Sequence, residues 1–238
     1  MNMLAPSRPR MSVEIVFDFV CPWCCMGIRR LIGVFRQRLD IETHYIWRPF
    51  LLNPTPQNDG IDFNDYLESR HGSRERADRL LRLIEMQAHE FDCSIHFDRI
   101  HHVPNTMNAH RLIEWASARG DCNSLVLAIF EAFFQNGDDI GNPGVLAEIA
   151  SRQGFDHDLA LHFLSGQTLV GTVTAGQIQA QKAGINGVPS FIIEGLALTG
   201  VHDAPALNRL MDAAMWVSGR HEDLRFGAPR MSSFSQRA

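Results

Sequence analysis

Residues 13–24 read VEIVFDFVCPWC, and the prediction of the fold starts from this stretch. Its first part, residues 13–20, is rich in β-branched and aromatic side chains, which predicts a short strand. After the motif, apolar residues recur at helical spacing, namely Ile28, Leu31, Ile32 and Phe35. We therefore expect a helix that begins at the cysteine motif, with Pro22 in its first turn, where proline is tolerated.

A second strand is expected after this helix. It runs from Ile41 to Phe50 and is closed by Asn53-Pro54. Strand–helix–strand order predicts a parallel pair of strands with a right-handed crossover. From Phe63 to about Gly166 we find no convincing strand, and amphipathic stripes predict about five helices instead.

Strands return near the end of the chain. Residues 191–194 and 196–199 are expected to be strands, between a helix at 168–183 and another that starts near Asp203. Helices inserted into the middle of one sheet domain explain this return best, so we predict an α/β fold. The expected parts are a sheet domain of residues 12–61 plus 167–218, an all-helical subdomain of residues 62–166, and flexible tails at 1–11 and 219–238.

Composition restricts the class of protein. The chain has 238 residues, of which 45% are hydrophobic and 21% charged, which is typical of a globular protein with a substantial core. The net charge of −5 argues against a nucleic-acid partner, and no apolar run is long enough for a membrane span. Residues 1–10 lack the apolar segment of a secretory signal, so we expect a cytoplasmic protein whose cysteines are mostly thiols.

Cys21 and Cys24 carry the predicted chemistry. Cys21 stands at the start of the helix, where unpaired N–H groups and the helix dipole favour negative charge and so the thiolate. Cys24 lies one turn further in, close enough to form a disulfide and to resolve a mixed disulfide. A zinc site is the alternative, but it needs two further ligands, for which His101-His102 is the local candidate. We predict a redox pair and no bound metal.

Several motifs of this chain resemble those of a known family. FDFVCPWC at 17–24, followed by GVPSF at 187–191, is similar to the DsbA-type thioredoxin-fold oxidoreductases, and most of all to their cytoplasmic FrnE-like branch. Further matches are WRPFLLNP at 47–54, Asn105-Thr106 with AHRL at 109–112, and GING at 184–187. The resemblance spans Ser12 to Val217 and implies a thioredoxin fold with an inserted helical subdomain.

The resemblance also implies a substrate-binding loop at Pro189. In this family the loop proline is cis and faces the CxxC motif, and the residue before it pairs with a substrate's backbone. Val188 would then bind an extended peptide or glutathione. The alternative is an ordinary turn proline before a strand. Pro22 and Trp23, between the two cysteines, complete the expected contact surface.

Four polar or aromatic residues are candidates for the same cleft. His110 is either a hydrogen-bonded or exposed helix histidine or a proton shuttle that faces the redox pair. Asn53, Trp47 and Arg48 are candidates because they lie at the carboxyl end of the expected second strand. For Trp47, core packing is the favoured role.

The other cysteines depart from the pattern or lie outside it. Cys25 directly follows the motif, and we interpret it as a small buried hydrophobe, with a competing resolving thiol as the alternative. Cys93 and Cys122 lie in the helical part with no partner in view and are expected to be inert. The arginines of the first helix, Arg29, Arg30, Arg36 and Arg38, are interpreted as its solvated face.

The leading functional hypothesis is a thiol–disulfide oxidoreductase that acts on protein or small-molecule thiols and disulfides. No bound cofactor is expected, and glutathione is a candidate co-substrate. One alternative is a glutathione-dependent enzyme similar to the 2-hydroxychromene-2-carboxylate isomerases and kappa-class glutathione transferases, which need no resolving cysteine. Another is a non-catalytic, chaperone-like binder. The direction of electron flow, the substrate, the electron partner and a homodimeric state stay open.

Overall fold

Four strands form one mixed sheet in the order β2-β1-β5-β6. The computed structural model describes residues 8–53 and 60–226, with side chains up to residue 219. β1 (Arg10–Phe17) and β2 (Glu42–Pro49) run parallel, as predicted. β5 (Ser190–Ile193) pairs antiparallel with both β1 and β6 (Leu196–Thr199). This sheet carries the site at the carboxyl end of β1.

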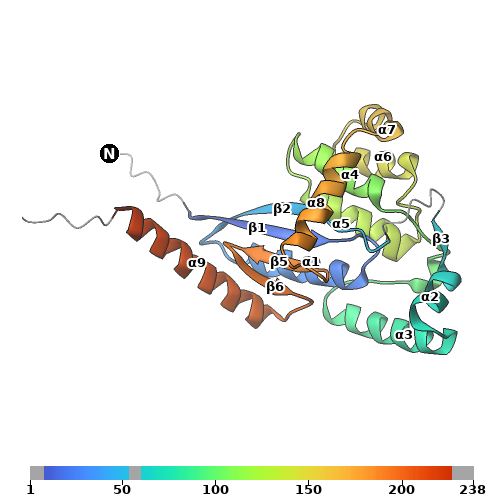
Figure 1. The fold of residues 1–238 in the computed structure, drawn as a ribbon, viewed down its shortest axis with the longest axis horizontal. Coiled ribbons are helices and arrows are strands. Elements are labelled where there is room, and N and C mark those ends of the chain that lie inside the picture. Colours follow the sequence, from blue (N-terminus) through green and yellow to red (C-terminus); the bar gives the residue numbers. More distant parts are fainter. Residues whose placement is uncertain (1–7, 54–59, 227–238) are drawn as a thin grey trace, which may run out of the picture.

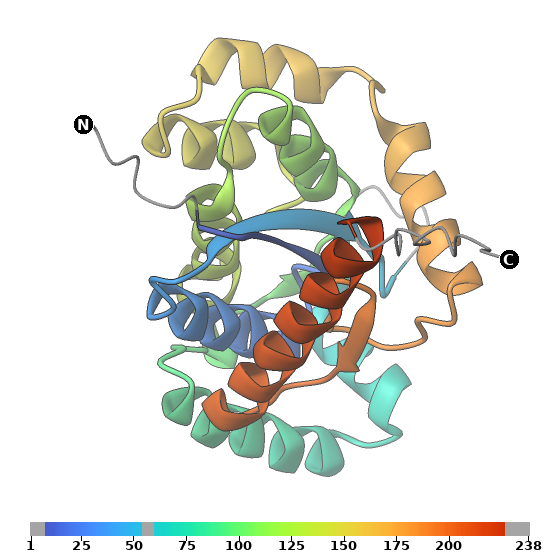
Figure 2. The ribbon, with the colours of Figure 1, turned by 90° about the vertical axis from the view of Figure 1, so that its left-hand side faces the viewer.

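Helices cover both faces of the sheet (Figure 1). α1 (Pro22–Arg36) and α9 (Ala204–Phe226) pack against each other on one face. α8 (Val170–Lys182) lies on the other face against β2 (Figure 2). This three-layer arrangement is the predicted α/β architecture with its thioredoxin-like core.

Burial on both faces explains why β1 ends in a continuous apolar run, Ile15 to Phe17, after an alternating first half. Ile15 and Phe17 belong to the large core that α1 completes. Val16, which points to the opposite face, packs with Phe50 and with Ala180 of α8. Successive side chains of a strand alternate between faces, so a strand covered on both sides needs apolar residues at every position.

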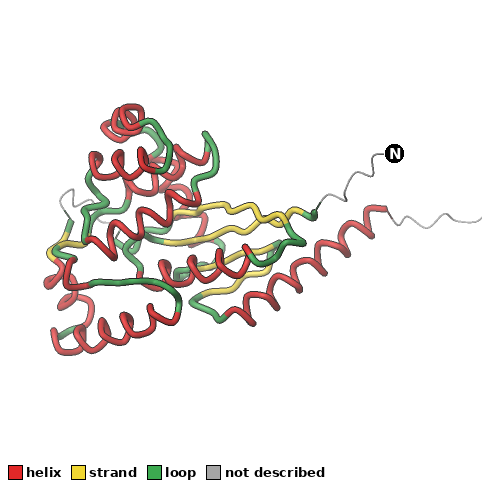
Figure 3. The backbone as a smooth tube through the Cα atoms, turned by 180° about the vertical axis from the view of Figure 1, so that it is seen from behind, coloured by secondary structure: helices red, strands yellow, loops and turns green. Residues whose placement is uncertain are grey.

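The inserted segment is helical and lies at one end of the strands (Figure 3). Its six α-helices in the described part of the chain are α2 (Phe63–His71), α3 (Arg74–Glu90), α4 (Met107–Ser117), α5 (Asn123–Glu131), α6 (Pro143–Arg152) and α7 (His157–Ser165). A π-helical turn, Ala132–Asn136, extends α5 directly, and a short 3-10 helix covers Phe97–Arg99. α3 to α7 are the five helices that apolar periodicity predicts.

Two features of this segment contradict the sequence analysis. A two-residue strand, β4 (His102–Val103), pairs with β3 (Ile61–Asp62), so the segment is not free of strands. α2 was not predicted at all, because Leu67 is its one buried residue among those described and no apolar stripe marks it. The two-residue ladder is too short to show an alternating pattern, and a helix with one buried residue shows no apolar stripe.

The ends of the fold also differ from the predicted boundaries. β1 begins at Arg10, so residues 10 and 11 belong to the sheet. α9 starts after its capping residue, with the Asp203 carboxylate accepting from the N–H of Ala206 at 2.8 Å, and continues to Phe226. The expected aperiodic tail from residue 219 is therefore wrong as far as 226. The remaining tail residues, 1–7 and 227–238, lie outside the described residues, as does Pro54.

Candidate active site

Cys21 is the N-cap residue of α1. Its backbone is extended (φ −90°, ψ 113°), and its carbonyl oxygen accepts from the N–H groups of Cys24 at 3.0 Å and Cys25 at 3.2 Å. Pro22 follows at the first helical position, where a missing N–H leaves no hydrogen bond unmade. The sulfur of Cys21 thus lies at the positive end of the helix, where an anion is favoured.

Cys24 lies one turn deeper and is fully buried. Burial raises the pKa of its thiol well above the ordinary value, and the hydrogen bond and negative charge of the Cys21 sulfur raise it further. Both cysteines are free thiols in this structure. The two sulfurs thus have unequal surroundings: Cys21, at 4% exposed, is one of the residues that line a pocket, and Cys24, fully buried, is not.

The loop at Pro189 lies directly beside Cys21. The peptide bond between Val188 and Pro189 is cis, and the Cys21 thiol donates to the Val188 carbonyl at 3.7 Å. The loop is held by a hydrogen bond from the N–H of Gly200 to the Pro189 carbonyl at 2.8 Å. A backbone carbonyl is thus placed next to the Cys21 sulfur.

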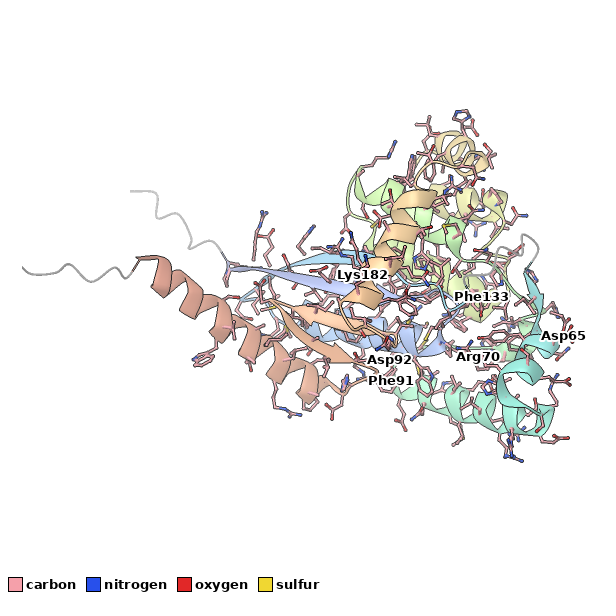
Figure 4. All side chains as sticks on the ribbon, viewed as in Figure 1. Asp65, Arg70, Phe91, Asp92, Phe133 and Lys182 are labelled. Carbon is pink, nitrogen blue, oxygen red and sulfur yellow. The ribbon has the colours of Figure 1, made fainter. Side chains whose placement is uncertain are left out.

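An apolar pocket of about 170 Å³ opens in front of Cys21. Pro22 and Trp23 form part of its wall, and α2 and α3 supply most of the opposite side. Arg70, labelled in Figure 4, is a charged member of the lining, and Phe133, also labelled, is one of its aromatic members. The pocket suits an apolar side chain of a substrate whose sulfur reaches Cys21.

His110 does not line this pocket. It is 2% exposed, and its ring packs against Phe17 and Phe19 with centroids 5.2 and 5.1 Å away. Its Nε2 lies 3.4 Å from Oδ1 of the fully buried Asp18. Of the two alternatives for His110, the structure favours a helix histidine held in the core over a proton shuttle that faces the redox pair, because α4 turns this residue into the core.

Asp18 is a site residue that the sequence analysis did not single out. Its Oδ2 accepts from the N–H of Leu52 at 2.7 Å, and its carbonyl accepts from the N–H of Cys21 at 3.2 Å. Its negative charge also contributes to the raised pKa of Cys24, after burial and the Cys21 sulfur. An acidic residue inside an apolar strand was the available signal, since a buried carboxylate needs specific partners.

The three candidates from the end of the second strand lie in different surroundings. Asn53 lies beside Tyr66, a pocket residue whose pKa is raised mainly by burial. Trp47 is buried, as favoured, and its Nε1–H donates to Oδ1 of Asn123 at 3.2 Å. Arg48 pairs with Glu14 at 2.7 Å on the sheet and is not part of the pocket. Tyr66 was missed because α2 itself was not predicted.

Cys25 and Cys93 lie close together, with their Sγ atoms 2.9 Å apart. Cys93 thus has a neighbouring thiol that was not in view from the sequence, and Cys25 is buried, as interpreted. Cys122 is buried and shares a hydrogen bond with Ser117 at 3.1 Å.

The described residues contain no group of three or more metal-ligating side chains. Within the same residues, no helix has the length and apolar character that a membrane crossing requires.

Fold and site together define a class: thioredoxin-fold proteins with a CxxC pair at a helix start beside a proline loop. Residues 12–212 match the family described as DSBA-like thioredoxin domain, and the chain belongs to this family. YwbO of Bacillus subtilis (strain 168), described as uncharacterized, is 25% identical over 195 residues, which cover 79% of this chain and 89% of YwbO.

Solved structures agree with this assignment. SCO1869 of Streptomyces coelicolor, described as a probable DsbA oxidoreductase, has a TM-score of 0.78 and 25% identity, covering 86% of this chain and 90% of that chain. A 2-hydroxychromene-2-carboxylate isomerase has a TM-score of 0.62 and 18% identity, covering 90% of this chain and 99% of that chain. The second similarity concerns the fold alone.

Proposed function

We propose that this protein is a thiol–disulfide oxidoreductase that cycles Cys21 and Cys24 between dithiol and disulfide. The observation that carries the proposal is the unequal placement of the two sulfurs: one lines a pocket at a helix N-terminus, and the other is fully buried one turn away. An attacking thiol must reach its substrate, whereas a resolving thiol must reach only its partner.

The reaction balances as two exchange steps. The Cys21 thiolate attacks a substrate disulfide, forms a mixed disulfide and releases one substrate thiolate. Cys24 then loses its proton and attacks the Cys21 sulfur, which releases the second substrate thiolate and leaves the Cys21–Cys24 disulfide. Two electrons pass from the protein to the substrate, and the same steps in reverse oxidise a substrate dithiol. The relative reduction potentials set the direction.

Substrate binding follows from the surroundings of Cys21. The Val188 carbonyl, 3.7 Å from the sulfur, is available to accept from a peptide N–H of an extended substrate. Trp23 and the α3 side of the pocket offer apolar contact to the adjoining side chain. We propose a cytoplasmic protein that acts on exposed cysteines of extended peptide segments, with glutathione as a co-substrate of the same site.

A glutathione-dependent isomerase is the second candidate, favoured by the shared fold with the 2-hydroxychromene-2-carboxylate isomerase. Such enzymes resemble this chain but need no resolving cysteine. The buried Cys24 therefore argues for the redox cycle. A chaperone-like binder would use the same apolar pocket without either sulfur.

Cys24→Ser separates these functions. Without a resolving thiol, the protein should stop multiple turnover of insulin disulfides and accumulate a mixed disulfide on Cys21. Cys122→Ser is the matched control, because it removes a buried thiol that lies outside the pocket. Undiminished turnover by Cys24→Ser would contradict the redox cycle. Turnover of a glutathione-linked aromatic substrate by that variant would favour the isomerase instead.

Suppression of aggregation tests the remaining alternative. The Cys21→Ser, Cys24→Ser double variant should lose all insulin reduction. If the parent protein shows no redox activity, and this double variant prevents aggregation of an unfolded protein as well as the parent does, a binder is the better description. A redox titration of the parent against glutathione measures the direction of electron flow.

A further inference from the structure

A second pair of cysteines lies behind the CPWC motif. Cys25 is on α1, and Cys93 is in the segment between α3 and the 3-10 helix. Each is 2% exposed, and their Sγ atoms are 2.9 Å apart. Carbon atoms in ordinary contact are about 3.5–4.0 Å apart, and disulfide sulfurs are about 2.05 Å apart. The two thiols are therefore within a short movement of bond formation.

Backbone hydrogen bonds hold both residues in place. The N–H of Cys93 donates to the carbonyl of Ala88 at 3.0 Å, directly after Asp92, which has a left-handed backbone at φ 51°. Asp92 and its neighbour Phe91 are labelled in Figure 4. On the other side, the N–H of Cys25 donates to the Cys21 carbonyl at 3.2 Å. The close approach of the sulfurs thus follows from two ordered segments.

Arginine side chains on α1 complete this contact between the two parts of the fold. The guanidinium of Arg30 lies 4.6 Å from the centre of the Phe91 ring, and its Nη2 donates to the carbonyl of Glu90. Arg29 forms an ion pair with Glu131 of α5. The interpretation of these arginines as a solvated face is therefore wrong for Arg29 and Arg30, which bind the helical subdomain.

The surroundings of the pair shift the pKa values of the two thiols in opposite directions. The hydrogen bond from Cys25 lowers the pKa of Cys93, and the positive charge of Arg29 acts in the same direction, against burial and Glu131. The same hydrogen bond, followed by burial, raises the pKa of Cys25 well above its ordinary value. Cys93 is thus suited to attack, and Cys25 to keep a proton until it resolves the product.

We propose that Cys25 and Cys93 are a redox modification site, which hydrogen peroxide converts to a reversible disulfide separate from the Cys21–Cys24 pair. The Cys93 thiolate attacks one peroxide oxygen, forms a sulfenic acid and releases the other oxygen as water once a proton is taken up. Cys25 then attacks the Cys93 sulfur, loses its proton, and displaces the hydroxyl as a second water. Two thiols lose two electrons, and one peroxide gives two waters.

The disulfide would join the two parts of the fold next to the active site. It would link α1, which begins at Cys21, to the end of α3. Leu80, Leu81 and Ile84 of α3 line the pocket in front of Cys21. Oxidation would therefore restrict movement of this pocket wall relative to the helix that carries the reactive sulfur.

Peptide mapping of the full chain tests the proposal. The Cys21→Ser, Cys24→Ser variant retains Cys25, Cys93 and Cys122, so a new bond there cannot come from the CPWC pair. After treatment with equimolar hydrogen peroxide, denaturation and alkylation, the peptides of Cys25 and Cys93 should be joined, with Cys122 alkylated. Dithiothreitol should release them. Recovery of both thiols alkylated, or of Cys93 as sulfinic acid without a cross-link, would overturn the proposal.

Two matched variants in the same background sharpen the test. Cys122→Ser should form the cross-link to the same extent as its parent. Cys93→Ser should not form it, and Cys25→Ser replaces this variant if Cys93→Ser does not fold. The oxidised parent should also melt several degrees higher than its reduced form, because the bond links segments that are 68 positions apart in sequence. An unchanged melting temperature in a fully cross-linked sample would contradict the link between the two parts.

Discussion

Gly27 on α1 is where the helix that follows Cys21 approaches the loop at Pro189 and the strand after it. A Cβ placed on Gly27 would lie 3.0 Å from Cγ of Pro189 and 3.2 Å from Cζ of Phe191. Phe191 is fully buried, and the Pro189 carbonyl is held by the N–H of Gly200 at 2.8 Å, so neither neighbour yields easily. Gly27→Ala should therefore push the loop and the helix apart.

A matched control exists on the same helix. A Cβ on Gly33 has no atom within 4 Å, so Gly33→Ala adds the same methyl group to open space. Both changes gain about 1 kcal/mol from helix propensity and from the less flexible unfolded chain. Overpacking a core costs about 1–3 kcal/mol, and this cost applies only to Gly27→Ala. The free energies of unfolding of the two variants should thus differ by about 1–3 kcal/mol, with Gly33→Ala the more stable.

Urea titrations measure this difference in the free energy of unfolding. The slope of that free energy against urea concentration is compared between the variants. Insulin reduction should show the displaced loop mainly as a raised KM for Gly27→Ala, because Val188 moves while the two sulfurs stay in place. Gly33→Ala should keep the parent's KM. Equal stability of the two variants within about 0.5 kcal/mol, which is the spread expected for independent sites, would refute the packing argument.

Three further predictions test other contacts. Arg111, 1% exposed, donates to the carbonyls of Thr168 at 2.8 Å and Gly166 at 2.7 Å. Because each buried carbonyl left without a donor costs about 1–3 kcal/mol, Arg111→Met should lower the free energy of unfolding by about 2–6 kcal/mol in a urea titration. Asp18→Asn removes a negative charge that raises the pKa of Cys24, so the midpoint of a rate–pH profile for the resolving step should move to lower pH; an unmoved midpoint would exclude this charge effect. The Cys25–Cys93 disulfide, between residues 68 positions apart, should raise the free energy of unfolding by about 4 kcal/mol over the reduced form. Urea titrations with and without dithiothreitol measure this difference, and a much smaller one would contradict the prediction.

Regular elements were predictable where a local pattern is strong. The apolar run of β1, the helical stripe after Cys21 and the capping residue Asp203 each lie within a few positions of the element they define. The same local rules failed for α2, which has one buried residue among those described, and for the two-residue ladder of β3 and β4. Elements with so little apolar pattern of their own are stabilised mainly by their neighbours in space.

The side to which a helix residue points was not readable from spacing alone. His110 belongs to an amphipathic helix, but it packs against Phe17 and Phe19 behind the motif because α4 lies over the sheet there. Arg29 and Arg30 have the charge of a solvated face, yet they bind the helical subdomain. In each case the partner belongs to a distant part of the chain.

Local sequence was enough to predict the Cys21–Cys24 pair and the strand and helix that carry it. Cys21 and Cys24 are placed by one helical turn, and that geometry depends on residues within a few positions of one another. The packing of distant segments, in contrast, was needed to show that Cys24 is fully buried, that Asp18 lies beside His110, and that Cys25 meets Cys93. These contacts join segments far apart in the chain, and their distances depend on how the inserted helices pack against α1 and the sheet.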